Sequence, residues 1–220
     1  MMFKTVSYKK QHIGVKAAKQ PAKAVWLALF VVGLLSGCAS TDNLGAGDSP
    51  APKQWQLNGK IGLIYPDADC SGQGDCRTKS DQGKISWQQQ TPHYRITLSD
   101  PFNRVVMSLA GDEQNLRATS PDQPPIDTTP NEFVAVLAHN ADNPALSTLS
   151  PAWLSYWVTG RPAPDSTVSQ KTGNAFTQAG YRVSARKWQQ TPLGHMPTLI
   201  VVKKDHFTLR LAVQSWQALK

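Results

Sequence analysis

The chain has 220 residues, of which 40% are hydrophobic, and it carries a formal net charge of +8. This length fits one globular domain with an additional N-terminal segment. Six lysines and no acidic residue fall within residues 1–23, so removing this segment lowers the net charge to about +2. The basic composition therefore gives no reason to expect nucleic-acid binding.

The N-terminal segment predicts a lipoprotein signal. An apolar run of about a dozen residues, 24–35, follows the lysines; it is too short for an ordinary membrane span but suits the core of a secretory signal. The run ends in "LSGC" (35–38), which resembles the bacterial lipobox. The thiol of Cys38 would form the thioether to diacylglycerol, and the small residues before it would admit the peptidase. We expect residues 1–37 to be removed and Cys38 to be lipidated.

The residues after Cys38 indicate the destination of the protein. Ala39 and Ser40 come next, and the absence of aspartate there resembles lipoproteins that are sorted to the outer membrane. Residues 38–53 are rich in Gly, Pro, Ser, Ala and Asp and predict a lipidated, flexible tether. We expect a single domain at 54–220, anchored to the outer membrane and facing the periplasm.

Two further cysteines, Cys70 and Cys76, lie in the Gly- and Asp-rich stretch "DADCSGQGDC". An even remainder of cysteines in a periplasmic chain favours a disulfide that closes this small loop. The alternative is a metal site formed by the thiols with Asp67, Asp69 and Asp75. The loop has no histidine, however, and neither the zinc nor the EF-hand spacing is present. We therefore predict no metal and no cofactor.

Apolar and polar residues then alternate in short runs separated by turn signals. Period two over such runs is typical of consecutive antiparallel strands with one buried face. The natural topology is a meander. The runs are 55–65, 85–87, 94–98 and 105–109.

The pattern changes in "TTPNEFVAVLAHN" (128–140). Thr129 and Glu132 have the capping-box spacing, and Pro130 occupies the first helical position. Phe133, with Val136 and Leu137, would lie on one apolar stripe of this helix.

A second helix is predicted in "SPAWLSYWVTG" (150–160), with Ser150 as the cap, Pro151 at the first position and Gly160 as the stop. Trp153 and Trp157 are four residues apart and share a face of this helix.

Strand periodicity resumes at 181–185, 199–201 and 207–213. The sequence therefore predicts a mainly β domain with a small helical lid. A sheet of this size with so few helices can bury its apolar face by curling around and using the helices as a cover. The tryptophans either fill the resulting core or line a cavity for an apolar ligand.

Catalytic motifs are scarce. The chain has no G-x-S-x-G, H-E-x-x-H, P-loop or G-x-G-x-x-G sequence. "KTG" (171–173) and "SARK" (184–187) have the form of two β-lactamase elements, but they stand in the wrong order and S-D-N is missing. We expect no enzymatic activity.

A series of motifs across the mature region resembles the LolB family of outer-membrane lipoproteins. No single motif is highly specific; their order and spacing, together with the lipobox, carry the resemblance. The motifs are "NGKIGL" (58–63), "ISWQQ" (85–89), "YRITLSDPFN" (94–103), "WVTGRP" (157–162), "GYRVSARKW" (180–188), "MPTLIVV" (196–202) and "LRLAVQSW" (209–216).

The resemblance implies an open, curved antiparallel sheet, an incomplete β-barrel, with helices as a lid over an apolar cavity. It also implies a receptor that accepts lipoproteins from a periplasmic carrier similar to LolA, binds their acyl chains and inserts them into the outer membrane. The expected partners are the carrier, the acylated lipoprotein cargo and outer-membrane lipid, and we expect a monomer.

The family carries an exposed apolar residue at a protruding turn, important for delivery to the membrane. The position matching this residue, usually leucine, is Phe102, and Asn103 stands where the family has glycine. The first difference preserves apolarity, whereas the second could alter the shape of the turn.

The pattern of aromatic residues adds candidates for the cavity or lid: Trp87, Phe133, Trp153 and Trp157. Two alternatives remain open from the sequence. One is a structural or assembly lipoprotein of the envelope with a packed core and no ligand cavity. The other is a hydrolase whose site carries no recognisable motif.

Overall fold

The computed structural model describes residues 50–66, 78–140 and 144–219, all within one compact unit, Thr41–Lys220. The signal segment, Cys38, most of the tether and the loop with Cys70 and Cys76 lie outside the described residues. The predictions of lipidation and of a disulfide therefore remain predictions.

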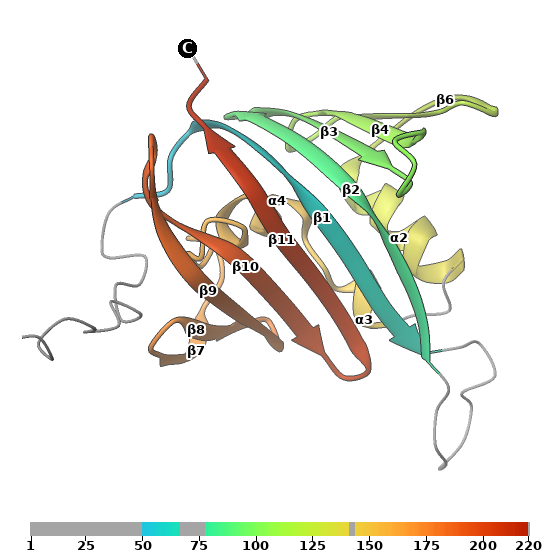
Figure 1. Cartoon of the computed structure of the whole chain (residues 1–220). Helices are drawn as coiled ribbons and strands as arrows, with labels where there is room; N and C mark the ends of the chain where they lie inside the picture. Colours follow the sequence, from blue (N-terminus) through green and yellow to red (C-terminus); the bar gives the residue numbers. More distant parts are fainter. Residues whose placement is uncertain (1–49, 67–77, 141–143, 220) are drawn as a thin grey trace, which may run out of the picture. The chain divides into compact units, whose positions relative to one another are not determined.

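In the described residues, one antiparallel sheet of eleven strands forms the domain (Figure 1). The strand order is β6-β5-β4-β3-β2-β1-β11-β10-β9-β8-β7, so the first strand pairs with the last and the edges are β6 and β7. Among the described residues these two edges do not pair with each other, and the sheet is open. The strands are β1 (Gln54–Pro66), β2 (Thr78–Gln90), β3 (His93–Ser99), β4 (Val105–Gly111), β5 (Leu116–Ser120), β6 (Gln123–Thr128), β7 (Val168–Thr172), β8 (Ala175–Gln178), β9 (Tyr181–Thr191), β10 (Gly194–Lys204) and β11 (Phe207–Gln217).

The described part of the connection from β6 to β7 contains three helices: α2 (Pro130–Asn140), α3 (Pro144–Ser147) and α4 (Pro151–Trp157). Figure 1 shows them together on one side of the curved sheet. The predicted mainly β architecture with a small helical cover is confirmed, and α3 is an additional short helix. No helix in the described part of the chain is long and apolar enough to cross a membrane.

The two predicted helix starts differ in their capping. At α2 the capping box is confirmed: the Glu132 amide donates to Thr129 Oγ1 at 3.2 Å, and the Thr129 amide donates to Glu132 Oε2 at 3.1 Å. These bonds from Thr129, with a further one from Thr128, hold the pKa of Glu132 below its usual value. At α4, Ser150 is at the cap position with Pro151 after it, but its side chain makes no capping hydrogen bond.

The core lies between the sheet and the helices. We call the sheet face that the helices cover the inner face; Leu57, Trp87, Ile96 and Leu109 lie opposite one another on it across β1 to β4. Burial of this face provides the main stabilisation, at about 25 cal/mol per Å² of apolar surface. Among the described residues, the buried core extends from Trp55 on β1 to Trp216 on β11, the two strands that pair at the middle of the sheet.

Gly160 follows α4, which ends earlier than predicted, at Trp157. It has φ +76°, and a Cβ there would lie 2.6 Å from the Trp188 ring. The glycine therefore permits both the left-handed turn and the close approach of the chain to Trp188.

We expect Gly160→Ala to lower the free energy of unfolding by about 2 to 4 kcal/mol, because conformational strain adds to a steric clash. Gly173→Ala is the matched control: Gly173 also has positive φ, +54°, but a Cβ there meets nothing within 4 Å. The control should lose only about 1 to 2 kcal/mol. Urea unfolding followed by tryptophan fluorescence measures both, and equal losses would show that Trp188 moves aside.

Candidate functional site

The turn between β3 and β4 presents Phe102 to solvent, with 79% of the residue exposed. Its backbone is fixed by Asp100: the Asn103 amide donates to the Asp100 carbonyl at 3.1 Å, and the Asp100 amide donates to the Arg104 carbonyl at 2.9 Å. The Arg104 guanidinium lies 5.8 Å from the centre of the Phe102 ring. Phe102 therefore does not fold back into the core but stands, exposed as expected, at the tip of an ordered turn.

Asn103 adopts φ +67°. This is the left-handed conformation, which glycine adopts freely and which asparagine tolerates better than most other residues. The replacement of the family's glycine by asparagine is thus compatible with a left-handed turn. The Asn103 side chain adds a contact that glycine lacks, because Oδ1 accepts a hydrogen bond from Lys84 Nζ on β2.

The carboxylate of Asp100 holds the turn together. It accepts hydrogen bonds from the Phe102 amide at 2.8 Å, the Arg104 amide at 3.0 Å and Arg104 Nε at 2.7 Å. Partial desolvation acts to raise the pKa of Asp100, but these hydrogen bonds and the charge of Arg104 outweigh it and hold the pKa below its usual value.

This depressed pKa predicts how the turn responds to acid. Because the folded carboxyl group has a lower pKa than the unfolded one, its stabilisation is complete above the ordinary value of about 3.9 and is lost as the pH falls through the folded value. The amide proton shift of Phe102, followed by NMR, should therefore stay constant from neutral pH down to that range and change only below it. In Asp100→Asn this transition should be absent. A change near neutral pH in the native protein would contradict the assignment.

Two further apolar side chains, Val105 and Val106, are exposed where β4 begins. With Phe102 we call them the apolar tip; Arg104 lies beside the Phe102 ring, and Lys84 donates a hydrogen bond to Asn103 in the same turn. An apolar tip with a cationic border suits contact with a lipid surface, where the apolar part enters and the charges meet headgroups.

The predicted cavity residues occupy different environments. Trp87 and Trp157 are buried in the core, Trp153 packs against it, and Phe133 on α2 is half-buried. Trp87 and Trp216 lie 5.2 Å and 5.4 Å from Trp55 between ring centres. Trp157 contacts Trp153 at 5.6 Å and Tyr181 at 5.4 Å. Five of the tryptophans in the described residues thus form two packed groups: Trp55, Trp87 and Trp216 on the sheet, and Trp153 and Trp157 on α4.

The inner face is less completely covered at β3 and β4. There the half-buried side chains of Ile96, Leu98, Met107 and Leu109 lie on adjacent strands; we call them the apolar strip. On α2 the predicted stripe is not buried as a core helix would be, because Val136 and Leu137 are exposed. Partly covered apolar surface on both the sheet and a neighbouring helix is where an apolar ligand would gain most from binding.

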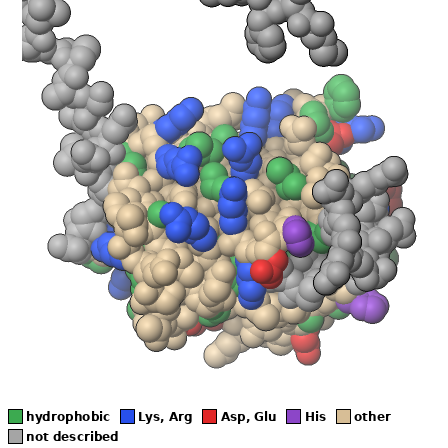
Figure 2. Space-filling model, turned by 90° about the horizontal axis from the view of Figure 1, so that it is seen from below, with side chains coloured by type: hydrophobic (Ala, Val, Ile, Leu, Met, Phe, Trp, Pro, Cys, Tyr) green, Lys and Arg blue, Asp and Glu red, His purple; other side chains and the backbone are tan. Residues whose placement is uncertain are grey.

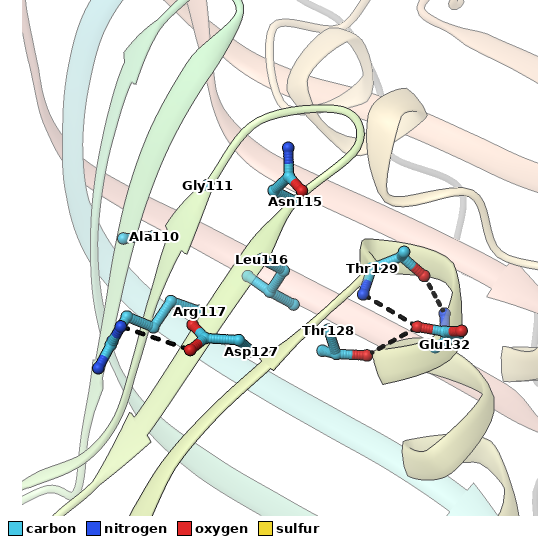
Figure 3. A pocket seen from close by; sticks show the side chains of 9 residues that line it. All are labelled: Ala110, Gly111, Asn115, Leu116, Arg117, Asp127, Thr128, Thr129 and Glu132. Atoms are coloured by element: carbon cyan, nitrogen blue, oxygen red, sulfur yellow. Dashed lines mark hydrogen bonds and ion pairs between the residues drawn. The ribbon is translucent and has the colours of Figure 1, made fainter.

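A hollow of about 490 Å³ opens between β4, β5, β6 and the start of α2 (Figure 3). Most of the residues that line it have polar side chains, and they include the ion pair between Arg117 and Asp127, at 3.4 Å, and the capping box of α2. None of the four predicted cavity residues lines it. Arg117 and Asp127 in its lining pair with each other, and the Glu132 carboxylate accepts hydrogen bonds from Thr128 Oγ1 and the Thr129 amide. In the described part of the chain, no group of three His, Cys, Asp or Glu side chains is placed to hold a metal ion.

Sequence reasoning missed Gln178 on β8, which is fully buried. Its Oε1 accepts hydrogen bonds from Trp157 Nε1 at 2.7 Å and from the Ala163 amide at 3.0 Å. Its Nε2 donates to the carbonyls of Ala163 and Ser166, both at 2.7 Å. Gln178 therefore fixes both α4 and the segment after it to the sheet. A glutamine at the end of a short polar strand gives no sequence signal for this role.

Comparison with known proteins identifies the family to which the chain is similar. The family model "Outer membrane lipoprotein LolB" matches residues 53–216. An outer-membrane lipoprotein LolB from Chromohalobacter salexigens is 28% identical over 213 residues, covering 89% of this chain and 91% of its own. The one from Cellvibrio japonicus is 27% identical over 209 residues, covering 87% and 95%. Among solved structures, a LolA superfamily protein from Nitrosomonas europaea is similar over 78% of this chain and 88% of its own, with a TM-score of 0.43 and 8% identity, a likeness too slight to support an argument.

Proposed function

The chain belongs to the LolB family of outer membrane lipoproteins, a family of lipoprotein receptors and not of enzymes, and we propose which part of the domain binds the cargo and which part contacts the membrane. The inner face of the open sheet accepts the acyl chains of a lipoprotein from a LolA-like periplasmic carrier. The tip formed by Phe102, Val105 and Val106 then contacts the outer membrane, where the cargo is released. One copy of the chain suffices for both steps.

The observation that carries the proposal is the exposure of Phe102 on a turn whose backbone is held by Asp100. A large aromatic side chain exposed to water forfeits about 1.5 to 3 kcal/mol that burial would provide. The turn nevertheless holds it outward. Entry into a bilayer recovers this free energy without any change in the fold.

The acyl chains require shelter during transfer. At about 0.8 kcal/mol per methylene group, three acyl chains would cost on the order of tens of kcal/mol to expose to water. The periplasm lacks ATP, so transfer must run downhill. It does so if the inner face binds acyl chains better than the carrier does, and if the bilayer binds them better still.

We assign the apolar strip as the first contact for the acyl chains, because all four of its side chains are only half-buried and they lie side by side on β3 and β4. Phe133 on α2 and Trp153 on α4 are only partly buried and act as the lid. Trp87 and Trp157 form the floor against which the chains come to rest.

The experiment uses a lipopeptide with brominated acyl chains, which quench tryptophan fluorescence on contact. We expect saturable quenching of the lipid-free mature chain, residues 38–220 produced without the signal segment and with Cys38→Ser, at one lipopeptide per protein. Trp153→Phe should reduce the quenched fraction, because Trp153 lies at the lid. Trp188→Phe is the control, since Trp188 stacks on His195 and is outside the proposed path.

A structural or assembly lipoprotein with a filled core is the competing account, favoured by the tight packing of the two tryptophan groups. It predicts no saturable quenching and no transfer of labelled cargo from a loaded carrier. Either result with the native protein would exclude the receptor mechanism proposed for the inner face.

A further inference from the structure

The outer face of the sheet, opposite the helices, collects cations from strands that are far apart in sequence. Lys60 on β1 lies opposite Lys84 on β2, and Lys203 on β10 lies opposite Arg182 on β9. Arg210 on β11 lies opposite Gly62, which is two residues along β1 from Lys60. Arg186 on β9 lies level with Lys60 across the sheet, because Arg186 pairs with Leu199, Leu199 with Ala212, and Ala212 with Lys60. We call these six residues the basic face: Lys60, Lys84, Arg182, Arg186, Lys203 and Arg210.

The charge of the basic face is not balanced locally. In the described residues of β1, β2, β9, β10 and β11, no outward-facing position of the paired segments carries Asp or Glu. Asp81 on β2 lies opposite Leu63, at a position that belongs to the inner face of the sheet. Its carboxylate accepts a hydrogen bond from the Tyr65 hydroxyl at 2.7 Å. Figure 2 shows a part of the surface on which Lys and Arg side chains gather with few acidic side chains between them.

These cations are available for a partner. Five of the six are exposed and Lys84 is half-buried. None of them takes part in the ion pairs found in the described part of the chain, which join His93 to Asp112, Arg104 to Asp100 and Arg117 to Asp127. Since the mature chain has a net charge of only about +2, six unpaired cations on one face are a local feature and not a consequence of overall composition.

The basic face is continuous with the apolar tip. Lys84 donates a hydrogen bond to Asn103, the residue after Phe102. Beside Lys84 the outer face has a hollow of about 180 Å³ lined by the side chains of Asn58, Ser86, Thr97 and Ser99, among others. Hydroxyl and amide donors next to an ammonium group match the oxygen atoms of a phosphate.

We propose that the basic face binds the phosphate headgroups of anionic phospholipids in the leaflet that Phe102 enters; this inference rests on the membrane contact proposed for the tip. A tether of residues 39–53 would reach at most about 50 Å, so a lipidated domain stays beside the bilayer. Headgroup binding lays the outer face toward the membrane and leaves the side with α2, α3 and α4 accessible to the carrier. An acidic protein surface would also fit the charge, but contiguity with the apolar tip favours lipid.

The test measures binding of the lipid-free mature chain, Cys38→Ser, to two kinds of vesicle: phosphatidylcholine alone, and phosphatidylcholine mixed with phosphatidylglycerol. Each cation near an anionic surface strengthens binding about fivefold. We expect Lys60→Glu with Arg210→Glu to weaken binding to the anionic vesicles on the order of 25-fold or more, and to leave binding to phosphatidylcholine unchanged. Raised salt should abolish the difference between the two vesicles.

The matched control is Lys53→Glu with Lys171→Glu, which makes the same change in net charge at two exposed lysines. Lys53 precedes β1, about 20 Å along the strand from Lys60, and Lys171 lies on the edge strand β7. We expect this control to weaken anionic binding less than fivefold. Equal weakening by both pairs would overturn the proposal, because net charge alone would then explain the binding.

Two further outcomes separate this inference from the proposed function. Phe102→Glu should weaken binding to both kinds of vesicle; if it weakens neither while the basic-face pair still acts, the membrane role of the tip fails and the headgroup site stands. If Lys60→Glu with Arg210→Glu leaves vesicle binding intact but blocks uptake of cargo from the carrier, the basic face docks an acidic protein and the headgroup proposal is wrong.

Discussion

Replacing Phe102 with glutamate is expected to leave transfer of cargo from the carrier to the domain intact and to block its delivery to liposomes. Phe102 is 79% exposed, so the substitution leaves the core and the inner face unchanged. Loss of about 2 kcal/mol of burial in the bilayer lowers partitioning on the order of 30-fold, and desolvation of the new carboxylate lowers it further. The measurement follows labelled lipoprotein from a loaded carrier to the domain and then to liposomes.

Phe102→Leu is the control for this prediction. It keeps an apolar side chain at the tip and should retain delivery, with a loss of at most a few-fold. Both variants should have the same midpoint of urea unfolding as the native protein, because an exposed side chain contributes little to stability. Delivery by Phe102→Glu at the native rate would show that the tip does not act in the membrane step. Failure to take cargo from the carrier would assign Phe102 to docking instead.

The second large effect concerns Gln178. Replacing it with leucine leaves Trp157 Nε1, the Ala163 amide and two backbone carbonyls without their partner. Each buried polar group that loses its hydrogen bond costs about 1 to 3 kcal/mol. We expect the free energy of unfolding to fall by about 4 kcal/mol or more, measured by urea denaturation.

Gln88→Leu is the matched control for Gln178→Leu. Gln88 is an exposed glutamine on β2 whose Nε2 donates to Gln56 at 3.4 Å, and its loss should change stability by less than about 0.5 kcal/mol. Similar small changes in both variants would mean that the segment after α4 finds other partners for its backbone. A large loss for Gln178→Leu would establish this amide as the attachment of α4 to the sheet.

Two hairpins were absent from the strand prediction. One is formed by β5 and β6, the other by β7 and β8, and they make the two margins of the sheet. β6 contains Pro124 and Pro125, which an edge strand tolerates because one side of its backbone faces no neighbour. The edge strands β6 and β7 are mostly exposed and therefore lack clear apolar alternation, whereas β5 and β8 have only five and four residues, too few for periodicity to reveal them.

The sequence by itself determined the features that depend on local order. Period-two runs predicted the central strands, the spacing of Thr129 and Glu132 predicted the start of α2, and the order of motifs led to the family that the match over 53–216 shows. The turn at Phe102 also belongs here, because Asp100 to Arg104 supply its hydrogen bonds within five residues.

Tertiary structure alone decided which distant residues meet. Periodicity identifies a strand but not its neighbour, because the neighbour is set by packing of the whole sheet. The pairing of β1 with β11 brings Lys60 near Arg210, and the fold of α4 against β8 buries Gln178 beneath Trp157. The inner core, the basic face and the attachment of the lid all depend on such long-range pairing. The contacts of the core and the lid form only when the sheet has assembled against its helices.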